Sequence, residues 1–342
     1  MTSARMRMMT VPLLVLSLGV LTVHARQDKK FDDANSNALL LEYKGKVKIS
    51  ASTYWPGWEP TKAIDRNVET SWFTNRGDAA ALGEQDLLVL AVKAPALAAL
   101  APTLAPMIGP HTVILPAMNG VPWWFGLGLP GPAAGMRLDA VDPVGAMADA
   151  LPPQQVIGCV VHMSALQVEP GRVEHRMGRG LVIGEPSGQR SERLDAVYEL
   201  LRRARIDASV PASIHEALWY KLWGNVTMNP VSALTGAATD AMLDDPLVRG
   251  FCSAVMTEVA AIGARIGCAV EQTPEDRHAV TRKLGAFKTS MLQDVEAGRA
   301  IELDAIVGAV RDIAAVVGQP APNLDALYAL TRLMARTRGL LA

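Results

Sequence analysis

The run DLLVLAVKAP at residues 86–95 constrains the fold more than any other stretch of the chain. It is a nearly continuous apolar segment of strand length, without the alternation of polar and apolar residues that marks a half-exposed strand. Such segments are typical of parallel sheets that helices cover on both faces. We therefore expect an α/β domain, with further strands at 111–120, 156–170 and 172–186.

From about Ser191 the pattern changes, and apolar residues recur at helical spacing toward the end of the chain. Long helices are expected near 192–205, 212–229, 246–267, 274–297 and 300–317. A chain of 342 residues is long enough for roughly two domains with cores of their own. The sequence thus predicts an α/β domain at 81–190 and an all-α domain at 191–342.

One of these helical segments carries an unusual polar stripe. In ALWYKLWGNVTMNP, residues 217–230, Lys221, Asn225 and Asn229 are four residues apart and share one face of a helix. Lysine and asparagine are scarce elsewhere, with only four of each from residue 81 onward. Either this face is a site that needs an ammonium and amides, or it is a solvated helix face. We expect Pro230 to end the helix, because proline cannot donate the next hydrogen bond.

The composition argues against several classes of partner. The formal net charge is −1 and no basic run occurs, so neither nucleic acid nor an anionic membrane surface is an expected partner. Cys159, Cys252 and Cys268 form no zinc motif and no disulfide framework, and we expect small buried residues of a reducing compartment. The histidines have no ligand spacing, so we expect no metal.

The N-terminus disagrees with a reducing compartment. Residues 1–25 contain Arg5 and Arg7, then an apolar run, and then small residues that suit a cleavage site after Ala25. This is the architecture of a secretory signal peptide, and the run is short for a membrane span. We therefore expect a signal-peptide-like segment and no membrane span in the mature chain.

Residues 26–80 form a second distinct block, with six of the ten lysines and three of the seven tryptophans. Within it, 48–78 resembles the opening of a discoidin (F5/8 type C) domain, through its ISAS strand, Pro-Gly turn, AID segment and SWFT strand. Arg66 stands where that family favours glycine. About thirty residues cannot bury the core of a β-sandwich, so we predict a discoidin-like fragment. A secreted carbohydrate-binding protein remains an alternative on this segment.

The rest of the chain, from about residue 81, resembles the ketopantoate reductase (2-dehydropantoate 2-reductase) family. The matching stretches are VKAP at 92–95, MNGVPWWF at 118–125, ALWYKLWGNVTMNPVSALTG at 217–236 and KTSMLQDVEAGRAIELDAIVG at 288–308. The resemblance implies a Rossmann-like cofactor domain followed by a helical domain. It also implies a cytoplasmic enzyme that transfers a hydride from NADPH to the 2-keto group of a small 2-keto acid, ketopantoate. A homodimer is a separate expectation, drawn from long apolar helices such as 246–267.

The same resemblance assigns seven site residues. They are catalytic Lys221 and Glu302, substrate-binding Asn225, Asn229 and Ser290, and cofactor-side Lys93 and Asn119. The chemistry suits these residue types, because hydride attack leaves negative charge on the carbonyl oxygen and an ammonium can donate a proton to it. Simpler roles remain open for three of them: Ser290 as a helix cap, Glu302 as a surface charge and Lys93 as a strand-end solubiliser.

The family's dinucleotide signature is missing from its usual place. A strand, G-x-G-x-x-G and a helix should open the chain, because the glycines let the backbone approach the pyrophosphate. The one literal match, GLGLPG at 126–131, follows a Trp-Trp-Phe turn, and we expect a loop there. We therefore predict a partial Rossmann-like domain without its first βαβ half. Two hypotheses follow, a reductase with impaired cofactor binding and an inactive fusion or remnant that acts as a binding protein.

Overall fold

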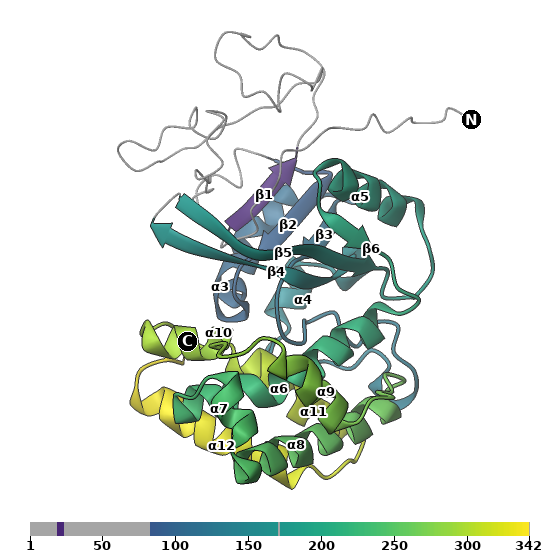
Figure 1. The fold of residues 1–342 in the computed structure, drawn as a ribbon. Coiled ribbons are helices and arrows are strands. Elements are labelled where there is room, and N and C mark those ends of the chain that lie inside the picture. The colour runs from purple at the N-terminus through teal and green to yellow at the C-terminus, as the bar shows by residue number, and fades with distance from the viewer. Residues whose placement is uncertain (1–18, 24–82, 170–171, 342) are drawn as a thin grey trace, which may run out of the picture. The chain divides into compact units, whose positions relative to one another are not determined.

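The computed structural model describes residues 19–23, 83–169 and 172–341 (Figure 1). The expected signal-like segment at 1–25, apart from residues 19–23, and the discoidin-like fragment at 26–80 lie outside the described residues. The chain divides into two compact units that interleave along the sequence. Unit 1 consists of Met1–Val92, Leu100–Met118 and Ala150–Ile214, and unit 2 of Lys93–Ala99, Asn119–Asp149 and His215–Ala342.

Unit 1 is built on two three-stranded sheets. The first has the order β1 (Gly19–Val23), β2 (Leu87–Ala91) and β3 (Val113–Pro116). Strands β2 and β3 are parallel, which confirms the expectation drawn from the apolar run at 86–95. The second has the order β4 (Gly158–Glu169), β5 (Arg172–Gly184) and β6 (Asp207–Ser209), with β4 and β5 antiparallel.

Strand β1 differs from a Rossmann first strand, because it pairs with β2 antiparallel and not parallel. It also lies within the segment that the sequence analysis assigns to a signal-like peptide. A segment removed after Ala25 would not be part of the folded sheet, so this pairing goes against cleavage there.

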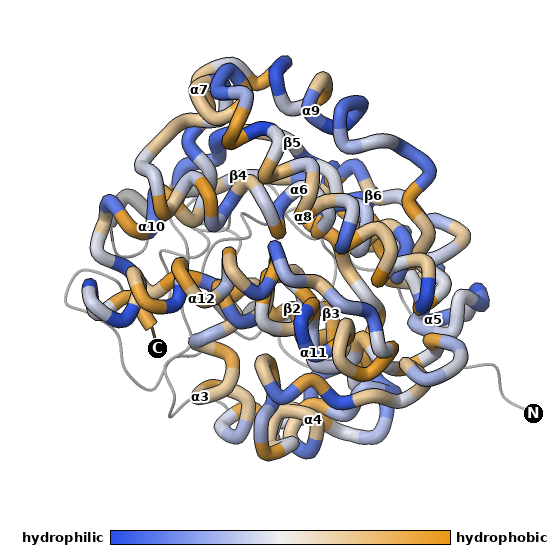
Figure 2. Tube along the Cα trace, turned by 90° about the horizontal axis from the view of Figure 1, so that it is seen from below, coloured by the Kyte–Doolittle hydropathy of each residue, from blue (hydrophilic) through white to orange (hydrophobic). Residues whose placement is uncertain are grey.

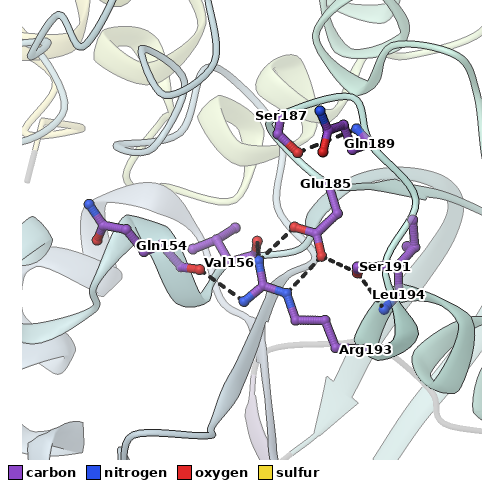
Figure 3. Close-up of polar contacts among 8 residues, drawn as sticks. All are labelled: Gln154, Val156, Glu185, Ser187, Gln189, Ser191, Arg193 and Leu194. Carbon is purple, nitrogen blue, oxygen red and sulfur yellow. Dashed lines mark hydrogen bonds and ion pairs between the residues drawn. The ribbon is translucent and has the colours of Figure 1, made fainter.

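Helix α5 (Glu192–Arg203) covers one core that both sheets share. Leu194 and Val197 of this helix belong to the same buried cluster as Leu87 of β2, Leu115 of β3 and Leu181 of β5. A polar cluster holds the start of the helix in place (Figure 3). Apolar and polar contacts therefore both hold α5 against the sheets.

The centre of that polar cluster is the buried side chain of Glu185. It accepts hydrogen bonds from Arg193 Nε at 2.7 Å, Arg193 Nη2 at 2.6 Å and Ser191 Oγ at 2.5 Å (Figure 3). Arg193 also donates to the carbonyl oxygens of Gln154 and Val156, and Ser191 caps α5 by accepting from Leu194 N. Burial alone would raise the pKa of Glu185, but the bonds from Arg193 and Ser191 outweigh it, and the pKa is lowered.

The remaining helices have the following bounds. They are α3 (Ala94–Leu104), α4 (Ala146–Ala150), α6 (Ile214–Thr235), α7 (Thr239–Asp244), α8 (Pro246–Arg265), α9 (Pro274–Arg282), α10 (Ser290–Glu296), α11 (Ala309–Val316) and α12 (Pro322–Thr337), with a π-helical turn at Asp304–Gly308. Figure 2 shows polar and apolar residues alternating along α12. Its buried residues Leu324, Leu327, Thr331 and Ala335 are spaced by three or four, as expected for a half-buried helix.

Two expectations about the helices are wrong. Helix α6 continues past Pro230 to Thr235, because the buried residues Val231 and Ala233 extend its apolar face and offset the missing hydrogen bond. The helix expected at 274–297 is two helices, α9 and α10. They are separated around Gly285, whose φ of +64° is a left-handed conformation that ends a helix.

Helix α8 is the central helix of unit 2. Its 20 residues are long and apolar enough to cross a membrane, by length and composition alone. However, it packs against α11 and α12, and its Glu258 accepts hydrogen bonds from Asn323 N, Asn323 Nδ2 and Leu324 N. The carboxylate thereby satisfies backbone donors at the start of α12. These contacts are those of a core helix of a folded domain.

Candidate active site

The structure brings Lys221 and Asn119 together. Lys221 lies in the middle of α6, and its Nζ donates a hydrogen bond to Asn119 Oδ1 at 2.8 Å. Asn119 follows β3 by three residues, and both side chains belong to unit 2. Both residues are half-buried, so the ammonium has a fixed partner and some access to solvent. The acceptor on one side orients the ammonium toward whatever binds on the other.

The loop that carries Asn119 is docked by its next two residues. Gly120 has a φ of +81°, and a Cβ on it would lie 2.8 Å from both Cβ and O of Ala305. Val121 N donates to Ala305 O at 2.7 Å. Ala305 belongs to the π-helical turn, a distortion that is frequent at functional sites. Only glycine suits position 120, because a side chain there would be strained and would strike the turn.

Glu302 lies just before that turn and is buried, with 7% of its surface exposed. Its Oε1 accepts a hydrogen bond from Ala94 N at 3.2 Å. Burial raises its pKa, the Ala94 N–H and the charges of Lys93 and Lys221 act in the opposite sense, and Asp294 raises it further. The surface-charge alternative for Glu302 is therefore wrong, and the carboxyl shares its surroundings with the amine of Lys221.

Lys93 is held by a residue that the sequence analysis did not single out. Its Nζ lies 2.5 Å from Oδ1 of Asp294, a side chain that is 5% exposed. Arg299 contacts the same oxygen through Nε at 3.0 Å and through Nη2 at 2.9 Å. Three donors thus converge on one carboxylate oxygen. The signal available in the sequence was only that Asp294 and Arg299 fall in the same stretch, 288–308, as Glu302.

The asparagines of the α6 stripe are not on a solvated face. Asn229 is 6% exposed and Asn225 is half-buried. Within the part of the chain that the structure describes, neither side-chain amide makes a hydrogen bond to protein. Amides without a protein partner are available to hydrogen-bond a ligand. Ser290 is exposed at the start of α10, and the residue that caps this helix is Thr289, which accepts from Leu292 N.

The described residues do not supply a dinucleotide cradle. GLGLPG at 126–131 lies in a turn and a short loop, followed by a three-residue 3₁₀ helix at Gly131–Ala133, so it opens no α-helix. The strand beside β2 is the antiparallel β1. A pyrophosphate site needs a glycine loop that joins a parallel strand to the N-terminus of a helix. The described residues therefore suit binding of a substrate carbonyl group, but they do not form a binding site for the pyrophosphate of a dinucleotide.

The described residues also contain no cluster of three or more His, Cys, Asp or Glu side chains that could hold a metal ion. Among the described residues the three cysteines form no disulfide bond and are buried, and burial raises the pKa of Cys252 and Cys268 to about 12. His215 is buried against Phe125, with Nε2 3.0 Å from the carbonyl oxygen, and burial lowers its pKa. These groups are parts of the core.

Comparison with known proteins gives matches along most of the chain. The profile described as "Ketopantoate reductase PanE/ApbA" matches residues 21–188, and that described as "Ketopantoate reductase PanE/ApbA C terminal" matches residues 213–335. The 2-dehydropantoate 2-reductase of Mesorhizobium japonicum is 42% identical over 258 residues, which are 75% of this chain and 79% of that protein. The match begins at residue 21, well before residue 81, and the comparisons support neither a discoidin fragment nor a signal peptide.

Solved structures agree. A proposed ketopantoate reductase from Ralstonia solanacearum superposes with a TM-score of 0.75 at 55% identity, covering 78% of this chain and 82% of that one. The 2-dehydropantoate 2-reductase from Methylococcus capsulatus gives a TM-score of 0.65 at 28% identity, covering 76% and 78%. At 22% and 18% identity, a dimeric ketopantoate reductase from Staphylococcus aureus and a D-mandelate dehydrogenase bound to NADH share the fold.

Proposed function

The chain belongs to the ketopantoate reductase family of oxidoreductases, and from that premise we propose that it reduces the 2-keto group of ketopantoate to the hydroxyl of pantoate, a step of pantothenate biosynthesis. The observation that carries the proposal is the hydrogen bond from Lys221 to Asn119, next to the buried carboxyl of Glu302.

Lys221 is the proton donor in this proposal. When the 2-keto carbon is reduced, its oxygen becomes an alkoxide, and a positioned ammonium can protonate it. General acid catalysis of this kind typically contributes 10²–10⁴-fold, or roughly 3–5 kcal/mol of barrier. Asn119 Oδ1 accepts one N–H of the ammonium and aims the others, and Glu302 accepts a hydrogen bond from a substrate hydroxyl.

The charges around Lys221 suit an anionic substrate. Three cations, Lys93, Lys221 and Arg299, face two carboxyl groups, Asp294 and Glu302. The balance is one net positive charge when Glu302 is ionised and two when it is protonated. A 2-keto acid brings one carboxylate and neutralises this excess.

The neutral polar residues of the site complete the recognition that we propose. Asn225 and Asn229 offer amides that have no protein partner among the described residues, and they bind the carbonyl and hydroxyl groups of the substrate. Ser290 is exposed at the start of α10 and binds the substrate carboxylate.

The hydride donor that we propose is NADPH, which supplies the hydride when bound, with Lys93 and Asn119 on its side of the site. Because the described residues lack the pyrophosphate cradle, we expect weak binding. If an intact site binds near micromolar, or about 8 kcal/mol, losing half of that free energy leaves a Kd of roughly 1 mM.

A second candidate is a substrate-binding remnant that does not reduce its ligand, favoured by the antiparallel β1 and the absent glycine loop. Two measurements separate it from the reductase. One is ketopantoate-dependent NADPH oxidation by the full chain beside Lys221→Ala, and the other is direct NADPH binding by calorimetry. Turnover that disappears in the variant supports the reductase. Binding of ketopantoate in the same calorimeter without binding of NADPH supports the remnant and contradicts the reductase.

The same proposal includes the domain organisation, the oligomeric state and the cellular location of the chain. We propose an incomplete Rossmann-like domain followed by a helical substrate and dimerisation domain, in a cytoplasmic enzyme that forms a homodimer. The boundary expected at 190/191 shifts, because α5 and β6 belong to unit 1 and the helical part begins near His215. The alternatives of a signal-like segment at 1–25 and a discoidin-like carbohydrate-binding fragment at 26–80 would imply secretion. Residue-resolved proteolysis of the purified chain, followed by mass spectrometry, tests this division.

A further inference from the structure

Asp294 has an unusual position for a buried carboxylate. Its Oδ1 is contacted by Lys93 Nζ, Arg299 Nε and Arg299 Nη2, and its backbone oxygen accepts from Arg299 N at 2.8 Å. Arg299 is half-exposed and is held by Asp294 from two sides, which closes the turn between α10 and Glu302. Lys93 comes from a distant part of the sequence, and its ion pair with Asp294 joins that segment to α10.

The alternative partner for Lys93 is Glu302. The residue after Lys93 is Ala94, whose N–H is bonded to Glu302 Oε1, so the lysine backbone already lies beside that carboxyl. The charge of Lys93 is felt at Glu302 and favours its ionised form. A flexible ammonium next to a buried carboxyl with one hydrogen bond would pair with it if it were released.

We propose that Asp294 is a positioning residue that holds the Lys93 ammonium away from Glu302, so that Glu302 stays available to the substrate and to Lys221. Each group near Glu302 then has its own partner. Asp294 forms an ion pair with Lys93, Asn119 accepts a hydrogen bond from Lys221, and the Ala94 N–H donates to one oxygen of Glu302. The proposal rests on the proposed function in one respect only, that Glu302 is the carboxyl which meets the substrate.

The test follows the protonation of Glu302 directly, by infrared difference titration of the full chain with the carboxyl band assigned through Glu302→Gln. In Asp294→Asn the released lysine and the lost negative charge both favour the ionised form, so the midpoint moves to lower pH. In Lys93→Met it moves to higher pH. In the double variant no lysine is left to be released. Its midpoint therefore lies higher than the sum of the two single shifts gives, and close to that of the wild type.

Activity gives a second readout at saturating NADPH and ketopantoate. Asp294→Asn lowers kcat about tenfold to a hundredfold, and adding Lys93→Met recovers part of the loss. Thermal melts of the variants establish that they fold, and Glu185→Gln serves as a matched control, since it removes a buried carboxylate outside the site.

An unchanged Glu302 midpoint in folded Asp294→Asn, or strictly additive midpoints in the double variant, overturns the proposal. If Asp294→Asn fails to fold, Lys93→Met alone decides, because the proposal requires its midpoint to rise. A sample without reductase activity still gives the infrared result, so failure of the proposed function is distinguishable from failure of this inference.

Discussion

Glu185 and Glu302 are both buried glutamates, one in each compact unit, but their surroundings differ sharply. Glu185 accepts two hydrogen bonds from Arg193 and one from Ser191, and its pKa is lowered. Glu302 accepts one backbone N–H, its neighbouring ammonium groups are bound to Asn119 and Asp294, and its pKa is raised. A carboxylate with all its donors in place stabilises a fold, whereas one left short of donors is available for chemistry.

A large effect on catalysis is expected from a change in the loop that supports Asn119. Gly120→Ala places a Cβ 2.8 Å from Ala305 and forces alanine to a φ of +81°. The loop must shift, Asn119 leaves Lys221, and kcat falls about a hundredfold, as a misplacement of about 1 Å can cause. Steady-state kinetics at saturating substrates measures this.

Gly236→Ala is the matched control for that substitution. Gly236 has a φ of +72°, but no atom lies within 4 Å of the added Cβ. It therefore costs only backbone strain, roughly 1 kcal/mol of unfolding free energy, with kcat retained. Equal losses of kcat in the two variants would contradict the role given to the Asn119 loop.

The two glutamates should also have opposite effects on stability against pH. The lowered pKa of Glu185 contributes stability that is present above its unfolded value, near 4.5, and is lost as the pH falls toward its folded value. The raised pKa of Glu302 means that the folded state binds the proton more tightly, so stability falls as the pH rises from about 4.5 through the folded value. Urea unfolding of Glu185→Gln and Glu302→Gln from pH 4 to pH 8 measures both slopes.

In that experiment the deficit of Glu185→Gln relative to the wild type grows as the pH rises, to about 3 kcal/mol, because Arg193 is left without its partner. The deficit of Glu302→Gln shrinks or reverses over the same range. If the deficit in unfolding free energy changed with pH in the same direction for both variants, the two glutamates would not differ as described.

The smallest effect is expected at the helix cap beside Glu185. Ser191→Ala removes both the cap of α5 and one donor to Glu185, and lowers the unfolding free energy by about 1 kcal/mol. Thr289→Ala removes the cap of α10 at a similar cost, and because Ser290 and Asp294 lie on that helix it also raises KM for ketopantoate a few-fold. A raised KM in Ser191→Ala would contradict the assignment of its cluster to stability alone.

Local pattern predicted much of the fold, and the reasons for the failures are physical. The apolar run at 86–95 predicted β2 and its parallel pairing with β3. An uninterrupted apolar segment indicates a strand that is buried on both faces, as strands of parallel sheets are. The break at Gly285 was missed although glycine is a visible signal for the end of a helix. The continuation of α6 past Pro230 depends on the burial of Val231 and Ala233, which the tertiary fold decides.

The site divides in the same way. The spacing of Lys221, Asn225 and Asn229 predicted a shared helix face, and the family resemblance supplied Asn119 and Glu302. Asp294 was missed because its importance lies in a contact with Lys93, from a distant part of the chain, which no local pattern contains. The antiparallel β1 was missed for the same reason, since strand pairing is decided by the tertiary fold.

The roles of the two glutamates are tested most directly by measuring melting temperature and turnover together in Glu185→Gln and Glu302→Gln of the full chain. We predict a crossover. Glu185→Gln melts at a lower temperature and keeps its kcat, whereas Glu302→Gln keeps its melting temperature near pH 7 and loses turnover of ketopantoate. Loss of the same property in both variants would contradict the claim that one buried glutamate stabilises the fold and the other serves the reaction.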